Sequence, residues 1–253
     1  MPLHWLAGGG EMSRLITEKA WAETPLGPIE SWPPSLLTTV SLCLASNFPI
    51  NIIWGPEHTQ IYNDGYRLLC GAAHPRALGE PYTVTWASAW PALHEPFEWA
   101  LSGQTSFLEN QRMFLERNGF PEETFFTFSL SPIRSESGEI VGLFHPVTET
   151  TAAMLSERRT RALRDVADKA GAARTVSEAC TLAVEAVSRY RRDVPMMLLY
   201  LAEGTSARLA GSFGVEAGSA AAPFVLPLSG GTWPLHLAKK SATAIPISQG
   251  AHV

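Results

Sequence analysis

Hydrophobic and polar residues alternate most clearly near the middle of the chain. Phe126, Phe128 and Leu130 share one parity, and threonine or serine occupies the positions between them. This alternation predicts a β-strand with one buried face. The segment 135–138 (SESG) is typical of a turn, and residues 140–147 predict an apolar return strand. A charged helical segment follows that strand directly.

The elements before this strand pair are short helices and strands. In chain order, we expect helices over 11–20 and 35–46, strands over 49–54 and 59–62, a short helix after residue 63, a helical region over 83–101 and a strand over 105–115. Pro91 and Pro96 are expected to interrupt the helical region, with Trp86 and Trp90 on one of its faces. This order predicts an α+β fold with an antiparallel sheet and helices on one side.

A proline-rich strap, WAETPLGPIESWPPSL, joins the first two helices. Its prolines exclude a continuous helix. We expect Trp21, Leu26 and Trp32 to be anchors that pin the strap to the main domain. Residues 1–33 are therefore assigned to an N-terminal helix and strap, and residues 34–150 to the main domain.

The remaining third of the chain predicts a linker and a small second unit. Residues 151–172 are helical and charged, with a weak apolar seam that fits either a two-helix dimer contact or a solvated linker helix. Thr175 and Glu178 have the spacing of a capping box. Strands are expected over 196–201, 208–213 and 224–228, and a short helix over 233–240. Two or three strands and two helices make a poor independent core, so 173–253 is interpreted as an incomplete domain.

Composition narrows the class of protein. The chain has 253 residues, of which 45% are hydrophobic and 17% charged, with a net charge of −5 and no basic run typical of a nucleic-acid surface. The first ten residues lack the pattern of a secretion signal, and no apolar run approaches the roughly 20 residues that span a bilayer. Three cysteines, odd in number and far apart in sequence, argue against a disulfide framework. We therefore expect a cytoplasmic protein that binds neither nucleic acid nor membrane.

The local sequence resembles a known family of sensor domains. Four segments are similar to the N-terminal PAS domain of bacterial multidomain (hybrid) sensor histidine kinases. They are the strap, NIIWGPEHTQIYNDGY, ERNGFPEETFFTFSLSPIRSESGEIVG and VTETT. The segment from Arg161 onward resembles the opening half of a GAF domain. The resemblance implies a five-stranded antiparallel sheet with helices on one face around a small pocket, then a linker helix and an incomplete GAF-like α+β unit.

The resemblance also implies a route for the signal. Thr148, Glu149 and Thr150 occupy the place of the family's exit motif, which resembles Asp-Ile-Thr, and are interpreted as the relay into the following helix. His145 and Pro146 depart from the family pattern. Because proline removes a hydrogen bond between strands, we expect a β-bulge at this point.

Aromatic residues are the main candidates for a ligand pocket, although rings at buried positions more often only fill a core. The candidate pocket residues are Trp54, Tyr62, Tyr66, Trp86, Trp90, Phe126 and Phe128. His94 is followed by Glu95 but lacks the other features of a phosphoacceptor site, and a surface histidine is preferred over a haem ligand.

Other cofactors and catalysis find little support in the sequence. Cys70 lacks the Asn-Cys-Arg setting of flavin photochemistry, and Cys43 and Cys180 are interpreted as core residues. No spacing of histidines or cysteines predicts a metal site, and no catalytic set is evident.

These observations predict a signal-sensing input region of a two-component sensor histidine kinase. Ligand or partner state would pass through the helix after the sheet to a downstream kinase, and the expected partners are a second copy of the chain, kinase domains and a response regulator. The main alternative is a stand-alone PAS interaction or dimerisation module without kinase output. A small-molecule enzyme is a third hypothesis, disfavoured because no acid–base pair converges in the sequence.

Overall fold

The computed structural model describes residues 10–229 and residue 233. The chain divides into two compact units, Met1–Met154 and Leu155–Val253, which are treated separately below. The expected strap and main domain both fall in the first unit. The helix expected over 233–240 lies outside the described residues, apart from Trp233.

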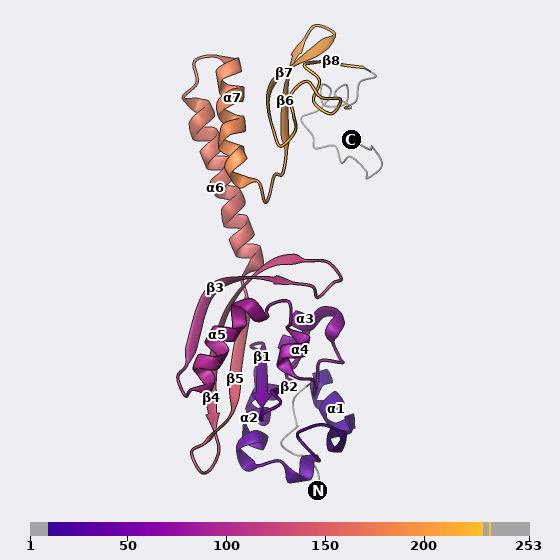
Figure 1. Cartoon of the computed structure of the whole chain (residues 1–253), viewed down its shortest axis with the longest axis vertical. Helices are drawn as coiled ribbons and strands as arrows, with labels where there is room; N and C mark the ends of the chain where they lie inside the picture. Colours follow the sequence, from indigo (N-terminus) through magenta and orange to yellow (C-terminus); the bar gives the residue numbers. More distant parts are fainter. Residues whose placement is uncertain (1–9, 230–232, 234–253) are drawn as a thin grey trace. The chain divides into compact units, whose positions relative to one another are not determined.

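The first unit is built on one antiparallel sheet (Figure 1). Its strands follow the order β2-β1-β5-β4-β3. Their bounds are β1 Ile50–Trp54, β2 Thr59–Tyr62, β3 Ser106–Leu115, β4 Glu122–Arg134 and β5 Ile140–Glu149. The alternating residues behave as predicted, because Phe126, Phe128 and Leu130 are buried on one face of β4. The predicted five-stranded antiparallel sheet and α+β class are confirmed, whereas the expectation of helices on one face alone is wrong, because α2 Pro34–Ala45 covers the other face at β1 and β2.

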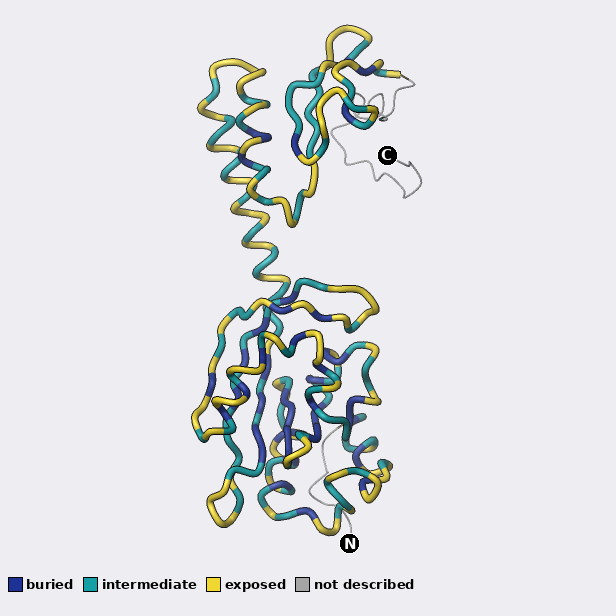
Figure 2. The backbone as a smooth tube through the Cα atoms, viewed as in Figure 1, coloured by how far each residue is buried: buried dark blue, intermediate teal, exposed yellow. Residues whose placement is uncertain are grey.

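Helices cover this sheet. Those of the first unit are α1 Gly10–Glu18, α2 Pro34–Ala45, α3 Asp64–Cys70, α4 Tyr82–Thr85 and α5 Trp90–Leu101. The connection from β2 to β3 contains α3, α4 and α5, which cover the face that carries Phe126 and Phe128. Ile52 and Ile53 are both fully buried and point to opposite faces of β1, so β1 is covered on both sides. Figure 2 shows this buried centre, and α2 packs on the second face of β1 and β2.

The strap is anchored as expected. The rings of Trp21 and Trp32 meet edge to face, with centroids 5.0 Å apart, and both are buried. The Trp21 indole donates a 2.7 Å hydrogen bond to the carbonyl of Ile16 in α1. Leu26 is partly buried against the same core. The strap thus closes the hydrophobic core of the first unit with two indole rings.

The helical region before β3 differs from its prediction. The helical region is interrupted at 86–89, where turns separate α4 from α5. Helix α5 then continues through Pro96. Pro91 lies in the first turn of α5, where its missing N–H has no partner to lose. The expected interruptions at both prolines are therefore wrong. Trp86 and Trp90 do not share a helix face, because Trp86 follows the end of α4.

The second unit holds a smaller sheet. Its elements are most of α6 Thr151–Gly171, then α7 Val176–Val187, β6 Met197–Glu203, β7 Ser206–Phe213 and β8 Val225–Pro227. The strands pair in the order β6-β7-β8. The side chain of Thr175 caps α7 by accepting a 3.1 Å hydrogen bond from the amide of Glu178, as the capping box predicts. Within the described part of the chain, no helix is long and apolar enough to cross a membrane.

Candidate functional site

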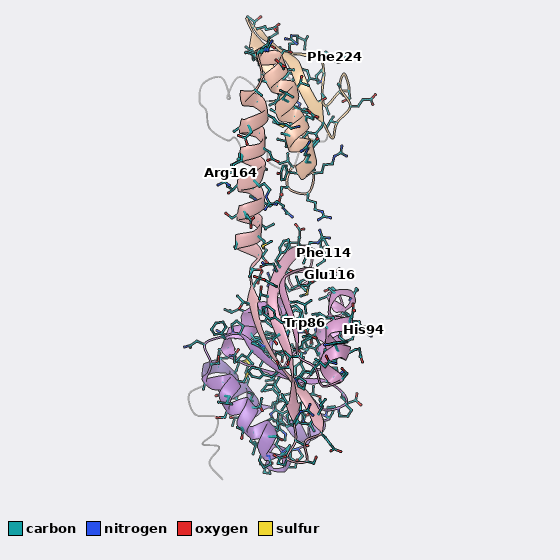
Figure 3. The ribbon with its side chains drawn as sticks, turned by 90° about the vertical axis from the view of Figure 1, so that its left-hand side faces the viewer. Trp86, His94, Phe114, Glu116, Arg164 and Phe224 are labelled. Atoms are coloured by element: carbon teal, nitrogen blue, oxygen red, sulfur yellow. The ribbon has the colours of Figure 1, made fainter. Side chains whose placement is uncertain are left out.

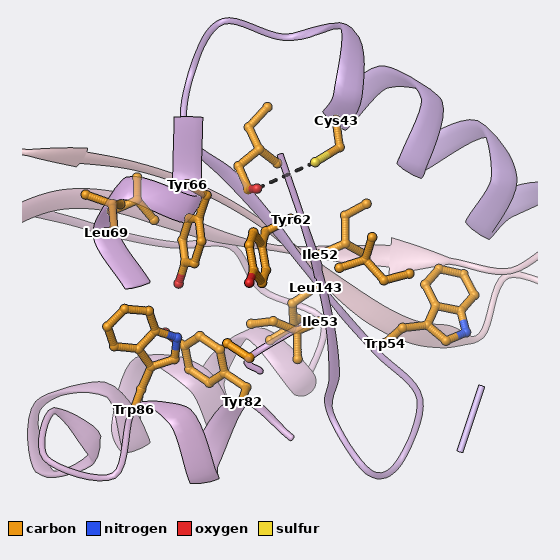
Figure 4. Packing of buried hydrophobic residues seen from close by; sticks show 14 of the residues in the cluster. Cys43, Ile52, Ile53, Trp54, Tyr62, Tyr66, Leu69, Tyr82, Trp86 and Leu143 are labelled. Atoms are coloured by element: carbon orange, nitrogen blue, oxygen red, sulfur yellow. Dashed lines mark hydrogen bonds between the residues drawn. The ribbon is translucent and has the colours of Figure 1, made fainter. Parts of the chain in front are cut away.

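A small cavity lies between the sheet and the helices of the β2–β3 connection. Its volume is about 30 Å³, which is room for one or two water molecules. Aromatic side chains from several elements form much of its lining: Tyr66 of α3, Tyr82 of α4, Trp86 after α4, and Phe126 and Phe128 of β4. Figure 4 shows the three rings that the helical segment contributes, Tyr66, Tyr82 and Trp86, close to one another.

The structure brings only some of the predicted pocket residues to this cavity. Tyr66, Trp86, Phe126 and Phe128 line it. Tyr62 is fully buried beside Tyr66, and its hydroxyl lies 2.9 Å from Nδ1 of His74. Trp54 lines a separate hollow of about 500 Å³ at the turn between β1 and β2. Trp90 packs against Phe97 and His94, outside the cavity lining.

His145 also lines the cavity, and it was not among the predicted site residues. It is 3% exposed and lies on the same face of β5 as Leu143 and Val147. Its Nδ1 is 2.9 Å from the carbonyl oxygen of Ser129. Since a carbonyl only accepts, Nδ1 carries the proton, and Nε2 accepts the 3.3 Å hydrogen bond from the Tyr82 hydroxyl. The sequence signal was a single polar residue at an inward position of an otherwise apolar strand.

The proline beside His145 explains the bond to Ser129. The register between β4 and β5 places Pro146 opposite Ser129, and the amide of Val147 points the other way, to Pro49 next to β1. Pro146 therefore has no N–H to offer the Ser129 carbonyl, and the imidazole of His145 supplies the donor instead. The register is the same on both sides of this point. The expected bulge at His145 and Pro146 is wrong, because a side chain replaces the missing backbone donor.

The polar groups of the cavity are uncharged near neutral pH. Burial lowers the pKa of His145 to about 4. Burial also raises the pKa of Tyr66 and Tyr82 well above their usual value. The cavity therefore offers neutral hydrogen-bonding groups within an aromatic lining.

The remaining candidates for cofactor chemistry lie elsewhere. His94 is exposed on α5, as Figure 3 also shows. Burial raises the pKa of Cys70 to about 12, which disfavours the reactive thiolate form. Cys43 is buried in the core, and Cys180 is partly buried on α7. Among the described residues, no group of histidine, cysteine and acidic side chains could hold a metal ion.

The predicted relay residues lie where β5 ends and α6 begins. The carboxylate of Glu149 accepts two hydrogen bonds from the guanidinium of Arg117, at 2.8 and 2.9 Å. The amide of Thr150 donates to the carbonyl of Phe125 at 2.8 Å, and the Thr151 hydroxyl donates to Glu149 at 2.8 Å. Burial opposes ionisation of Glu149, but the bonds from Arg117 and Thr151 outweigh it and lower the pKa of this carboxyl.

Comparison with known proteins gives structural matches alone. No protein-family model and no curated protein matches the chain. Solved structures that are similar include an RNA-binding light-oxygen-voltage receptor, with 18% identity and a TM-score of 0.39 over 59% of this chain and 43% of that one. A sensory box sensor histidine kinase from Vibrio cholerae has 16% identity and a TM-score of 0.31 over 45% of this chain and 86% of that one. The LOV domain of Aureochrome1 has 16% identity and a TM-score of 0.34 over 45% of this chain and 98% of that one.

These likenesses concern the fold alone. The first unit is an α+β fold with strand order β2-β1-β5-β4-β3 and with helices inserted between β2 and β3, and its five-stranded antiparallel sheet agrees with the architecture that the sequence resemblance implies.

Proposed function

We propose that this chain is the signal-sensing input region of a cytoplasmic two-component sensor histidine kinase. The first unit senses a ligand or partner, and α6 passes its state to the second, GAF-like unit and to kinase domains downstream. In this proposal, a response regulator receives the phosphoryl group, and two copies of the chain associate through their terminal helices. The chain itself has no catalytic role, and the proposal rests on the resemblance together with the geometry of the β5–α6 junction.

The junction is the observation that supports this function most directly. β5 ends at Glu149 and α6 begins at Thr151, so one residue separates a central strand of the sheet from a helix of 21 residues. Arg117 lies just beyond β3 and holds Glu149 with two charge-assisted hydrogen bonds. A shift of β3 relative to β5 would therefore strain or release the first turn of α6.

Such a relay needs a difference in affinity between two states. A ligand shifts an equilibrium only as far as it binds one state better than the other. The turn after β3 is suited to this role, because Arg117 also contacts Glu122 at the start of β4, at 3.4 Å. Arg117 thus joins three strands at the point from which α6 leaves the sheet.

Replacing Arg117 with alanine tests the relay. We expect the amides of 150–156 to exchange with solvent about tenfold faster in Arg117→Ala, because Glu149 and the first turn of α6 lose their clamp. Hydrogen exchange read by mass spectrometry on the full chain measures this. Arg112→Ala is the matched control, since Arg112 lies on β3, the strand that Arg117 follows, and its partner Glu123 is at the longer distance of 3.8 Å. Equal exchange in both variants would contradict the relay.

The kinase output is tested on the product of the natural gene. We expect this product to carry acid-labile, base-stable phosphate after incubation with ATP, and Arg117→Ala to change its level about threefold or more. If the gene product lacks such phosphate but hydrogen exchange at 150–156 changes as expected, the sensor relay is supported. The kinase output is then contradicted.

The stand-alone interaction module remains the second candidate. Its supporting observation is a group of exposed phenylalanines along β3 and the turn that follows it. Phe107, Phe114 and Phe120 are 66, 48 and 59% exposed. Exposed aromatic side chains of this kind are enriched at protein interfaces. The module is favoured if Phe114→Ser no longer binds a partner protein that the unmodified chain binds, while the amount of phosphate on the gene product stays unchanged.

A further inference from the structure

Trp86 separates two hollows of the first unit. Its side chain and that of Leu115 line both the cavity of about 30 Å³ and a second, open pocket of about 320 Å³. The second pocket lies among the end of α3, the turn after α4 and the end of β3, and its polar residues include Arg76 and Arg117. Figure 3 shows Trp86 in the interior and Glu116, another residue of this pocket, at the end of β3. Trp86 and Leu115 are therefore the wall between the cavity and the outer pocket.

The Trp86 side chain is buried in this wall, and its ring also lies near that of Tyr82, with centroids 6.5 Å apart. Its indole N–H donates a 3.0 Å hydrogen bond to Oε1 of Gln60. Its ring meets that of Tyr66 edge to face, with centroids 5.9 Å apart. The backbone of 86–89 forms turns between two helices, and Ala87 and Ser88 are exposed. The indole can therefore leave the wall without unwinding a helix.

Gln60 would be left short of a donor if the indole moved away. Its side chain is fully buried, and its Oε1 also accepts a 2.9 Å hydrogen bond from Asn51. Its Nε2 donates to the hydroxyl of Thr85 at 2.9 Å, which fixes the orientation of the amide. Oε1 therefore faces the indole as an acceptor. A buried acceptor that loses a donor is costly unless another N–H replaces it.

We propose that Trp86 is an internal plug, and that the site it closes binds a bicyclic heteroaromatic compound with a ring N–H. The compound displaces the indole, donates its N–H to Gln60 and lies between the rings of Tyr66 and Tyr82. The outer pocket alone is in the size range of small-molecule sites, roughly 300–1,000 Å³, and its charged side chains accommodate a polar substituent. This inference deepens the proposed sensor function, because Arg117 at the outer pocket also holds Glu149 at the relay.

Binding of two matched probes to full-chain variants tests the plug. Indole carries the ring N–H, and benzofuran has nearly the same shape without it. In Trp86→Ala, we expect indole to bind about tenfold more tightly than in the unmodified chain, which must first move its own side chain out of the site. In the same variant, benzofuran should bind about fivefold more weakly than indole, because it does not replace the donor that Oε1 of Gln60 loses with the indole and leaves it the bond from Asn51. Isothermal titration calorimetry measures both ratios.

Trp90→Ala is the control, since Trp90 is a partly buried tryptophan outside both linings. It should bind indole no better than the unmodified chain. The plug is overturned if Trp86→Ala and Trp90→Ala bind indole alike, and the ligand class is overturned if Trp86→Ala binds indole and benzofuran alike. If indole binds tightly but does not change hydrogen exchange at 150–156, the result supports the ligand site. It then contradicts only the relay to α6.

Discussion

His145 makes the stability of the first unit depend on pH. The folded protein keeps this imidazole neutral down to about pH 4, whereas in the unfolded chain its pKa is near 6.5. The contribution of His145 to the free energy of unfolding is therefore fully present above pH 6.5. It decreases as the pH falls from 6.5 to 4. Since one unit of pKa shift corresponds to 1.36 kcal/mol, we expect a loss on the order of 3 kcal/mol across this window. Urea unfolding followed by circular dichroism at each pH measures it.

His145→Gln isolates this contribution. Glutamine is neutral at every pH, and its side-chain N–H can replace the donor to the Ser129 carbonyl. Burial also lowers the pKa of His58 and His74, so the difference between the two proteins is the quantity to follow. A difference that stays constant from pH 7 to pH 4 would show that His145 is not the titrating group.

Single residues also show where sequence reasoning reaches its limit. Alternation predicts the face to which a strand residue points, and it placed Phe126 and Phe128 correctly on the inner face of β4. It does not predict which element an inward ring will meet. Tyr62 points inward like His145 but meets His74, and Trp54 lies at the far end of β1 beside another hollow. The depth of a ring within the core depends on long-range packing, which a local pattern does not contain.

Among the elements, α1 depends on a residue of α3 to satisfy its first turn. The carboxylate of Asp64 accepts hydrogen bonds from the amides of Glu11 and Met12, at 3.1 and 3.4 Å. These amides have no partner within the helix. We expect Asp64→Ala to lower the free energy of unfolding by about 1–2 kcal/mol, because this removes a cap. The amides of α1 should also exchange faster, which mass spectrometry measures.

Two other substitutions separate this cap from general effects of charge. Asp64→Asn keeps an acceptor oxygen and should recover much of the loss. Glu18→Ala removes a carboxylate whose partner in the structure is Arg14, both about 57–58% exposed, and should change the free energy of unfolding by less than about 0.5 kcal/mol. An Asp64→Ala protein as stable as Glu18→Ala would contradict the cap.

The elements that sequence predicted well are those whose pattern is local. The strands and the hairpin turn follow from alternation and from glycine at positions such as Gly55 and Gly138, both of which have positive φ. The errors concern proline. Pro96 stays within α5, and Pro146 stays within β5 because His145 supplies a donor to Ser129. Whether a missing N–H breaks an element depends on neighbours that are distant in sequence.

The whole molecule is expected to unfold in two steps. The first unit has a continuous core with many large side chains, among them Trp21, Tyr62 and Phe97. In the described part of the second unit, the buried hydrophobic residues are mostly alanine, and Phe213 and Leu226 are the largest of them. Since burial of apolar area is the main source of stability, the second unit should open first. Trypsin should therefore cut within 155–229 before it cuts the first unit.

Core truncations in each unit separate the two steps. Phe213→Ala should move the first denaturant transition to lower urea by removing about 3–5 kcal/mol, and should leave the second transition in place. Phe128→Ala should move the second transition and leave the first. If either variant shifts a single shared transition, the units are coupled into one cooperative structure, and a relay through α6 would then act by concerted unfolding rather than by a change at its first turn. Independent transitions, in contrast, require that any signal pass through the folded junction at Glu149 and Thr151, where the Arg117 variant tests it.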